Sequence, residues 1–379
     1  MSVDSEKMYH YRNGIDLLES KEFDEQRESI AQFIKSQCKS ENLHLLIGSG
    51  CSLPSIPLMG KTFEQIKNNI NEVKMVLGKF NGDSKDIEGY LNWLNTGISF
   101  FEETSADYLK YRKAFDATKK ELLKSIRVNY YDESDTTTNT TLVNYLNFYN
   151  CIFSQRGYNK NAPINVFTTN YDLFNEVALE KLGIHYTNGF RGSVNRMFDP
   201  AEFRLRLVDD ENRYKDKWSA IRRYVKLYKI HGSIDWQYSN ALNAIIQTNS
   251  KTYTKTDEAT DIMIYPTVHK HFETQQTPYS ELFREFTINL QKKNSTLIVL
   301  GYGFPDEHIN QLIAQSLNNE DFTLIIFGDK DEEKATAFIS QHQGRQNLHF
   351  IGGAYNGSSQ NGHHFHNVIE MLGQGDNHA

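Results

Sequence analysis

Residues 43–52 read Leu-His-Leu-Leu-Ile-Gly-Ser-Gly-Cys-Ser, and the predicted fold can be built outward from them. The first five are a short, mostly apolar run, which predicts a buried strand of a parallel sheet. The Gly and Ser residues that follow predict a tight turn from this strand into a helix. Gly48 and Gly50 allow unusual backbone conformations and a close approach by a ligand. Because free N–H groups at the start of a helix bind anions, we expect a phosphate group at this turn.

Other apolar runs along the chain also end in glycine or small polar residues, and helical patterns follow most of them. Strand–helix alternation predicts an α/β fold with a doubly wound parallel sheet. In such sheets, ligands bind beyond the carboxyl ends of the strands, so we expect one shared site there. The predicted strands and their terminal motifs are 164–168 with Thr169-Asn170-Tyr171-Asp172, 225–230 with His231-Gly232-Ser233, 297–300 with Gly301-Tyr302-Gly303-Phe304, and 324–327 with Gly328-Asp329.

Composition limits the class of protein. A chain of 379 residues, 39% hydrophobic and 12% aromatic, has enough apolar material for one large domain or two ordinary ones. A net charge of −7 argues against a general nucleic-acid binder. The scattered Cys38, Cys51 and Cys151 predict no disulfide framework and a reducing compartment. With no signal-peptide pattern and no run near the roughly 20 apolar residues of a membrane helix, we expect a cytoplasmic protein without contact to a membrane.

The chain divides into three predicted parts. Residues 1–40 are expected to form a helical N-terminal extension, with an amphipathic stripe that includes Phe23 and Ile30. Residues 41–352 form the main domain, and residues 84–160 form a helical module inserted in it. Residues 353–379 are expected to be a polar C-terminal tail with a short helix near 368–372.

The glycine turn does not fit the two commonest phosphate-binding motifs. A dinucleotide fingerprint needs Gly where the chain has Leu53, and a phosphate loop ending in Gly60-Lys61-Thr62 needs Gly where it has Ser55. A different glycine-rich phosphate turn remains, with a turn that binds nothing as the structural alternative.

The polar motifs also have structural alternatives. Asn170 and Asp172 could form an Asx turn and helix cap, and His231 could be a hydrogen-bonded core residue. Gly301 and Gly303 could serve a turn alone. Two histidine groups lack ligand partners at suitable spacing, so we expect no metal site. They are His269 with His271, and His363, His364 and His366.

Taken together, the motifs at 48–52, 169–172, 231–232 and 301–304 stand in the order of the sirtuin family, which the chain resembles over about residues 43–352. The chain is most similar to bacterial sirtuin-like effectors of antiphage defence, including those encoded beside a HerA-type ATPase. One feature departs from the sirtuin deacylases, which carry a four-Cys zinc ribbon after the His-Gly motif. Residues 233–300 contain no Cys, so the resemblance implies a Rossmann-like sirtuin fold without a zinc ribbon and puts deacylation in doubt.

The resemblance implies that NAD is the substrate and that the bond between nicotinamide and ribose is cleaved, giving nicotinamide and ADP-ribose. It implies catalytic roles for Asn170 near the reacting carbon, for Asp172 at the nicotinamide amide and for His231 as a base. It also implies a HerA-type ATPase partner and a homo-oligomer. The alternatives are a non-catalytic NAD- or ADP-ribose-binding module that regulates a partner ATPase and, less favoured, a deacylase or ADP-ribosyltransferase. The residues implied to bind NAD are Gly48, Ser49, Gly50, Cys51, Ser52, Thr169, Gly301, Gly303 and Asp329.

Overall fold

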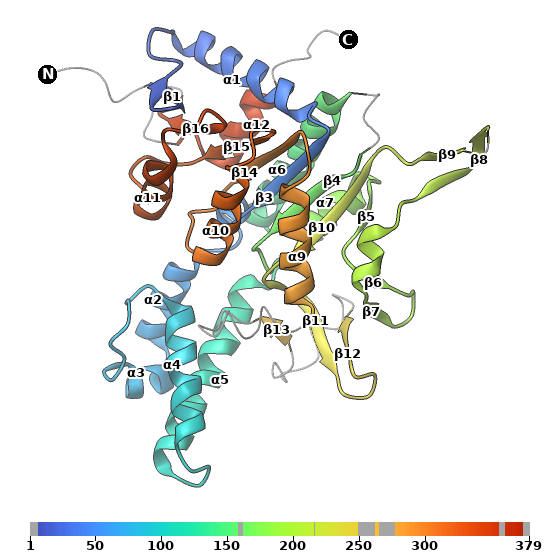
Figure 1. Cartoon of the computed structure of the whole chain (residues 1–379). Coiled ribbons are helices and arrows are strands. Elements are labelled where there is room, and N and C mark those ends of the chain that lie inside the picture. The colour runs from blue at the N-terminus through green and yellow to red at the C-terminus, as the bar shows by residue number, and fades with distance from the viewer. Residues whose placement is uncertain are drawn as a thin grey trace, which may run out of the picture.

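A large sheet forms the centre of the computed structural model, which describes residues 7–157, 162–215, 217–248, 262–264, 277–355 and 361–373 (Figure 1). Within these residues the sheet has nine strands. They are β1 (Met8–Arg12), β2 (Ile15–Asp16), β3 (Asn42–Ile47), β4 (Ile164–Thr168), β5 (His185–Thr187), β10 (Tyr224–Lys229), β14 (Ser295–Leu300), β15 (Phe322–Phe327) and β16 (Leu348–Gly353).

The strand order is β2-β1-β16-β15-β14-β3-β4-β10-β5. Neighbours from β16 to β5 are parallel, whereas β1 pairs antiparallel with both β16 and β2. After β3 the chain adds β4 on one side, and it later returns to add β14 on the other side. The prediction of an α/β protein with a large parallel sheet is therefore confirmed, and the carboxyl ends of β3, β4, β10 and β14 lie along one edge.

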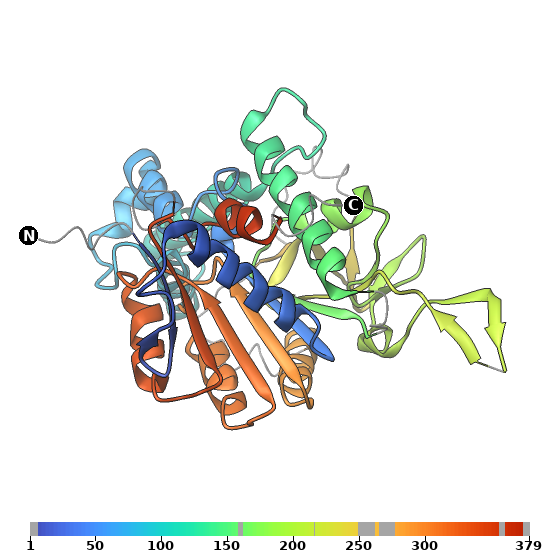
Figure 2. The same cartoon turned by 90° about the horizontal axis from the view of Figure 1, so that it is seen from above.

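Hydrophobic clusters cover both faces of the sheet. In β3, Leu43, Leu45 and Ile47 belong to one buried cluster and Leu46 belongs to the other, as the alternation of side chains along a strand requires. Buried residues of α1, α6, α7 and α12 belong to the first cluster, and those of α9, α10 and α11 belong to the second. The two sets of helices lie on opposite faces of the sheet (Figure 2). These helices are α1 (Phe23–Cys38), α6 (Thr136–Arg156), α7 (Phe174–Lys181), α9 (Tyr279–Leu290), α10 (Glu307–Ser316), α11 (Glu333–His342) and α12 (Phe365–Gly373).

A group of helices fills the connection from β3 to β4. These are α2 (Met59–Asn69), α3 (Asn71–Leu77), α4 (Ile87–Phe100) and α5 (Ala106–Ile126), which pack on one another beside the sheet (Figure 1). The last helix of the connection, α6, instead packs on α1, α7 and α12. The helical segment therefore begins earlier than the predicted residue 84, and its final helix belongs to the layer that covers the sheet.

The chain termini differ from the prediction. Residues 8–12 form β1, whose Met8, Tyr9 and His10 are buried against β16, rather than part of a helix. At the other end, α12 is longer than the predicted short helix and buries residues such as Phe365 and Val368. Both segments are short, and their pairing with distant elements determines their structure, which local sequence does not encode.

A second sheet follows directly from the carboxyl end of β10. Its strand order is β13-β11-β12-β7-β6, and Trp236 of β11 is fully buried in it. A separate hairpin of β8 and β9 projects from the body (Figure 1). No helix in the described part of the chain has the length and apolar character needed to cross a bilayer. The strands are β6 (Phe190–Arg191), β7 (Arg196–Phe198), β8 (Val208–Tyr214), β9 (Lys217–Ala220), β11 (Gly232–Ser239), β12 (Ala244–Gln247) and β13 (Ile262–Ile264).

Candidate functional site

The turns after β3 and β14 touch through their backbones. The Gly48 N–H donates to the Leu300 carbonyl at 2.8 Å, and the Gly50 N–H donates to the Gly301 carbonyl at 2.9 Å. A Cβ atom at Gly48 would overlap the Gly301 carbonyl, and Gly301 itself has a φ of +60°, which favours glycine. These glycines therefore allow two turns, about 250 residues apart in sequence, to pack in direct contact.

The turn after β3 is not the start of an α-helix. Residues Ser49–Ser52 form a short 3-10 helix, and the next α-helix begins only at Met59. The Cys51 N–H donates to the Gly48 carbonyl at 3.1 Å, and the Gly50 N–H is already bonded to Gly301. The N–H groups of Gly50 and Cys51 are therefore bonded within the protein, and phosphate binding at this turn stays a prediction. Cys51 is fully buried, which raises the pKa of its thiol well above the usual value.

Asn170 joins the loop after β4 to the glycine turn. Its Nδ2 donates to the Gly48 carbonyl and to Ser52 Oγ, both at 3.0 Å. The side chain is buried, and its Oδ1 has no hydrogen-bond partner among the described residues. Because a carbonyl can only accept, the bond to Gly48 fixes which end of the amide faces the turn. Asn170 therefore holds an acceptor oxygen that a ligand or a water could use.

Asp172 lies beneath the same loop and is buried. Its Oδ2 accepts from Ser52 Oγ at 2.7 Å, and its Oδ1 accepts from the Phe174 N–H, at the start of α7, at 3.1 Å. Burial raises the pKa of the Asp172 carboxyl, while Lys229 and the Ser52 hydroxyl oppose this rise. The contacts of Asp172 are those of a helix-start and turn-holding residue, the structural alternative that the sequence left open.

His231 follows β10 and is only partly buried. Its Nε2 lies 3.6 Å from Asp306 Oδ2, and its ring centroid lies 6.4 Å from that of Tyr171. Asp306 is a buried residue just before α10 and comes three residues after Gly303. Asp306 was not predicted from the sequence, because the glycine motif was taken to end at Phe304.

The remaining predicted residues extend the site toward β15. Gly303 lies against the Glu332 carboxylate, which a Cβ atom at this position would overlap. The Asp329 carbonyl accepts from the Glu332 N–H at 3.2 Å, so Gly303 and Asp329 are connected through Glu332. Thr169 donates its N–H to the Ile47 carbonyl at 3.3 Å.

The predicted residues thus lie along one edge of the sheet but at two depths. The buried ones are Gly48, Cys51, Ser52, Asn170 and Asp172. Those with side chains or backbone open to solvent are Ser49, Gly50, Thr169, His231, Gly301, Gly303 and Asp329.

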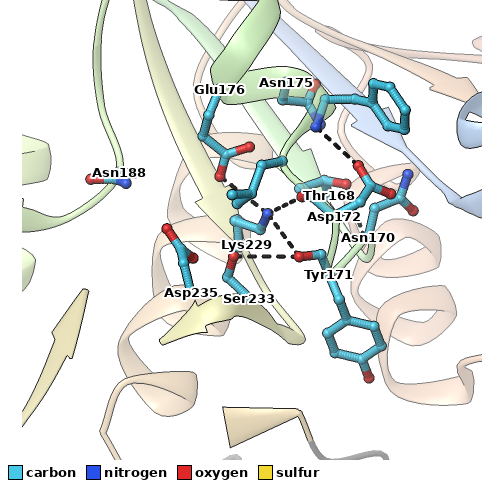
Figure 3. Close-up of polar contacts among 12 residues, drawn as sticks. Thr168, Asn170, Tyr171, Asp172, Asn175, Glu176, Asn188, Lys229, Ser233 and Asp235 are labelled. Atoms are coloured by element: carbon cyan, nitrogen blue, oxygen red, sulfur yellow. Dashed lines mark hydrogen bonds and ion pairs between the residues drawn. The ribbon is translucent and has the colours of Figure 1, made fainter. Parts of the chain in front are cut away.

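A buried lysine beneath the loop was also missed (Figure 3). Lys229, the last residue of β10, places Nζ 3.1 Å from Glu176 Oε1 and bonds the backbone carbonyls of Tyr171 and Asp172. Burial raises the pKa of the Glu176 carboxyl, and the nearby Lys229 ammonium opposes this rise. The available signal was a lysine at the end of a mostly apolar strand, two residues before His231.

Metal ligands do not gather in the described residues, among which no group of three His, Cys, Asp or Glu side chains could hold an ion. His269 and His271 lie outside the described residues. His363, His364 and His366 are described and form no such group.

Fold and site together define an α/β protein whose polar groups gather at the carboxyl ends of a parallel sheet, where such folds bind nucleotides. Residues 164–347, just under half of the chain, match the family model of the SIR2-like domain. The match includes Asn170, Asp172, His231 and Gly301 but begins after the glycine turn at 48–52. A search of curated proteins found no match.

Proposed function

We propose that this protein is an NAD glycohydrolase, which releases nicotinamide and leaves ADP-ribose. The observation that carries this proposal is the Asn170 amide, whose nitrogen is fixed on the glycine turn while its oxygen lacks a partner among the described residues. The partly exposed imidazole of His231 lies at the same edge of the sheet. The SIR2-like match supports NAD as the ligand.

Cleavage of the nicotinamide–ribose bond develops positive charge on the sugar ring, as in glycoside hydrolysis. Asn170 Oδ1 is suited to accept a hydrogen bond from the attacking water or a ribose hydroxyl. His231 is suited to take the proton, since a neutral imidazole carries a ring nitrogen that can accept one. The Asp306 carboxylate, 3.6 Å from Nε2, favours the imidazolium that then forms.

The pyrophosphate and adenosine are proposed to lie over the accessible groups at Ser49, Gly301, Gly303 and Asp329. Asp172 was expected to contact the nicotinamide amide. Both of its carboxylate oxygens accept hydrogen bonds within the protein. We therefore propose that Asp172 acts by holding Ser52 and the loop after β4 in place.

The test is incubation of the purified chain with NAD, alone and with the product of the neighbouring gene, followed by chromatography of the products. We expect nicotinamide release, reduced by about 10²–10⁴ in Asn170→Ala and His231→Ala, the range for a proton-transfer group. His185→Ala is a matched control, because His185 is an exposed histidine on β5. Full activity in either site variant would remove that residue from the mechanism, and no release by the wild type under both conditions would contradict the proposal.

A binding module without turnover is the second candidate. The contacts of Asp172 favour it, because both carboxylate oxygens accept hydrogen bonds within the protein and hold the loop. Tight binding of NAD or ADP-ribose without product, with and without the partner, would establish this candidate instead.

A role in antiphage defence by NAD depletion, with a HerA-type ATPase and a homo-oligomeric assembly, is proposed from the sirtuin-like resemblance. Co-expression with a HerA-type ATPase, followed by size measurement of the complex and by measurement of cellular NAD during phage infection, tests each part. Unchanged NAD in infected cells that carry both genes would contradict the defence role.

A further inference from the structure

A fully buried ammonium group lies directly beneath the loop that carries Asn170. The Lys229 side chain has no exposed surface. Its Nζ donates to the Tyr171 carbonyl at 3.4 Å and to the Asp172 carbonyl, and it pairs with Glu176 Oε1 at 3.1 Å (Figure 3). An ammonium has three N–H donors, and two of them are given to these backbone carbonyls.

The partners of the Lys229 ammonium differ from those of an ion pair that only stabilises the fold. Burying a charged pair costs about as much free energy as the attraction returns, so such a pair is weak evidence for stability. Here the two hydrogen bonds of the ammonium go to consecutive backbone carbonyls of one loop, and the Glu176 carboxylate lies near it as an ion-pair partner. The geometry is therefore that of a clamp on residues 171 and 172.

The clamped loop also contacts the segment that follows His231. The Tyr171 carbonyl accepts from the Ile234 N–H at 3.0 Å and from Ser233 Oγ at 3.4 Å, in addition to Lys229. One carbonyl thus joins the loop after β4 to the first residues of β11. Its neighbour Asn170 is fixed on the glycine turn, and His231 lies immediately before β11.

We propose that Lys229 is a positioning residue, whose ammonium fixes the Tyr171 and Asp172 carbonyls and thereby sets the placement of Asn170 relative to His231. This inference rests on the proposed NAD glycohydrolase function for its catalytic consequence. Glu176 supplies the counter-charge that keeps the ammonium in the interior.

The test uses the double variant K229M/E176Q, which removes both charges and so leaves no unpaired buried ion. Hydrogen exchange of the full chain, followed by mass spectrometry, measures opening of peptides that contain residues 169–173, with a peptide that contains residues 48–52 as the internal reference. We expect faster exchange only in the loop. We expect kcat for nicotinamide release to fall by about 10²-fold with KM nearly unchanged. A displacement of a catalytic group by about 1 Å is enough for a loss of this size.

K226M is the matched control, because Lys226 lies three residues earlier on β10 and donates to the Phe203 carbonyl instead. It should leave loop exchange and kcat unchanged. If K229M/E176Q does not fold, K229Q/E176Q retains a side-chain donor for one of the two carbonyls, and intermediate loop exchange is expected.

Unchanged exchange at 169–173 in a folded double variant would overturn the clamp. Faster loop exchange with an unchanged kcat would overturn the positioning role. If the wild type releases no nicotinamide, the proposed function fails while the exchange measurement still decides whether Lys229 holds the loop.

Discussion

At the scale of single residues, Gly48 and Gly301 determine how closely the ends of β3 and β14 approach. Hydrogen bonds from Gly48 and Gly50 to the 300–301 backbone leave no room for a side chain between the two turns. From the sequence, these glycines were expected to let a ligand approach the backbone. The structure shows a further role, because the Gly301 carbonyl of the neighbouring turn approaches Gly48 and Gly50, while ligand binding at this turn stays a prediction.

Gly48→Ala should therefore destabilise the fold. A Cβ atom here meets backbone that cannot move without displacing a strand, so we expect the free energy of unfolding to fall by about 1–3 kcal/mol. Denaturant unfolding of the purified variant measures this. Gly344→Ala is the control, since a Cβ atom at Gly344 has nothing within 4 Å, and equal stability of the two variants would contradict the explanation.

At the scale of elements, the sheet is extended by β1 and β2, which lie in the segment predicted to be a helical N-terminal extension. β1 pairs with β16 through a buried contact between His10 Nε2 and His349 Nδ1 at 2.9 Å. Burial lowers the pKa of His10 to about 4 and that of His349 to about 3. The strands with long apolar runs were predictable from sequence, but β1 was not, because it is five residues long and depends on a partner at the far end of the chain.

The histidine pair should make the fold acid-sensitive. Because both pKa values lie below the unfolded value of about 6.5, the neutral pair contributes stability above pH 6.5 that is lost as the pH falls toward 4. Each histidine should remove up to about 1.4 kcal/mol per pH unit in that window. Thermal unfolding between pH 7.5 and 4.5 tests this. The variant H10Q/H349Q should show a shallower slope, and an identical slope would exclude the pair as a cause.

The C-terminal helix should be required for stability. α12 buries Phe365, Val368, Met371 and Leu372 against α6 and α1, so a chain that ends at residue 355 leaves these helices uncovered. We expect this truncation to lower the unfolding temperature strongly or to prevent folding, because several large apolar side chains are lost together. A chain that ends at residue 373 is the control and should unfold like the full chain. Equal unfolding temperatures for both truncations would contradict this.

At the scale of the whole molecule, the site joins turns from five segments that lie far apart in the sequence. Their common edge could be predicted, since strands of a parallel sheet place their carboxyl ends together. Their depth could not be predicted, because the loop after β4 is held by distant residues. Tyr145 Oη accepts from Asn170 Nδ2 at 3.4 Å and Tyr130 Oη accepts from the Leu173 N–H at 2.8 Å, and both tyrosines come from the connection between β3 and β4. Lys229 and Asp306 were missed for the same reason: each acquires its role from a partner on another strand or loop.

Ligand binding across these segments should stabilise the entire fold. NAD or ADP-ribose at about 100 times its dissociation constant should add about 2.7 kcal/mol to the free energy of unfolding, provided that it binds only the folded chain. Thermal unfolding with increasing ligand measures the shift, with AMP as a smaller reference compound. Absence of any shift with both NAD and ADP-ribose would contradict the catalytic and the binding-module proposals alike.

The described sheet ends in β2 on one side and β5 on the other, strands of only two and three residues. Such short edge strands expose few unpaired backbone N–H and C=O groups, which protects a sheet against edge-to-edge pairing and aggregation. We therefore expect that a stable contact between copies of this protein uses side chains of the helices and of the projecting hairpin, and not the edges of this sheet. Substitutions on those surfaces should change the strength of the contact.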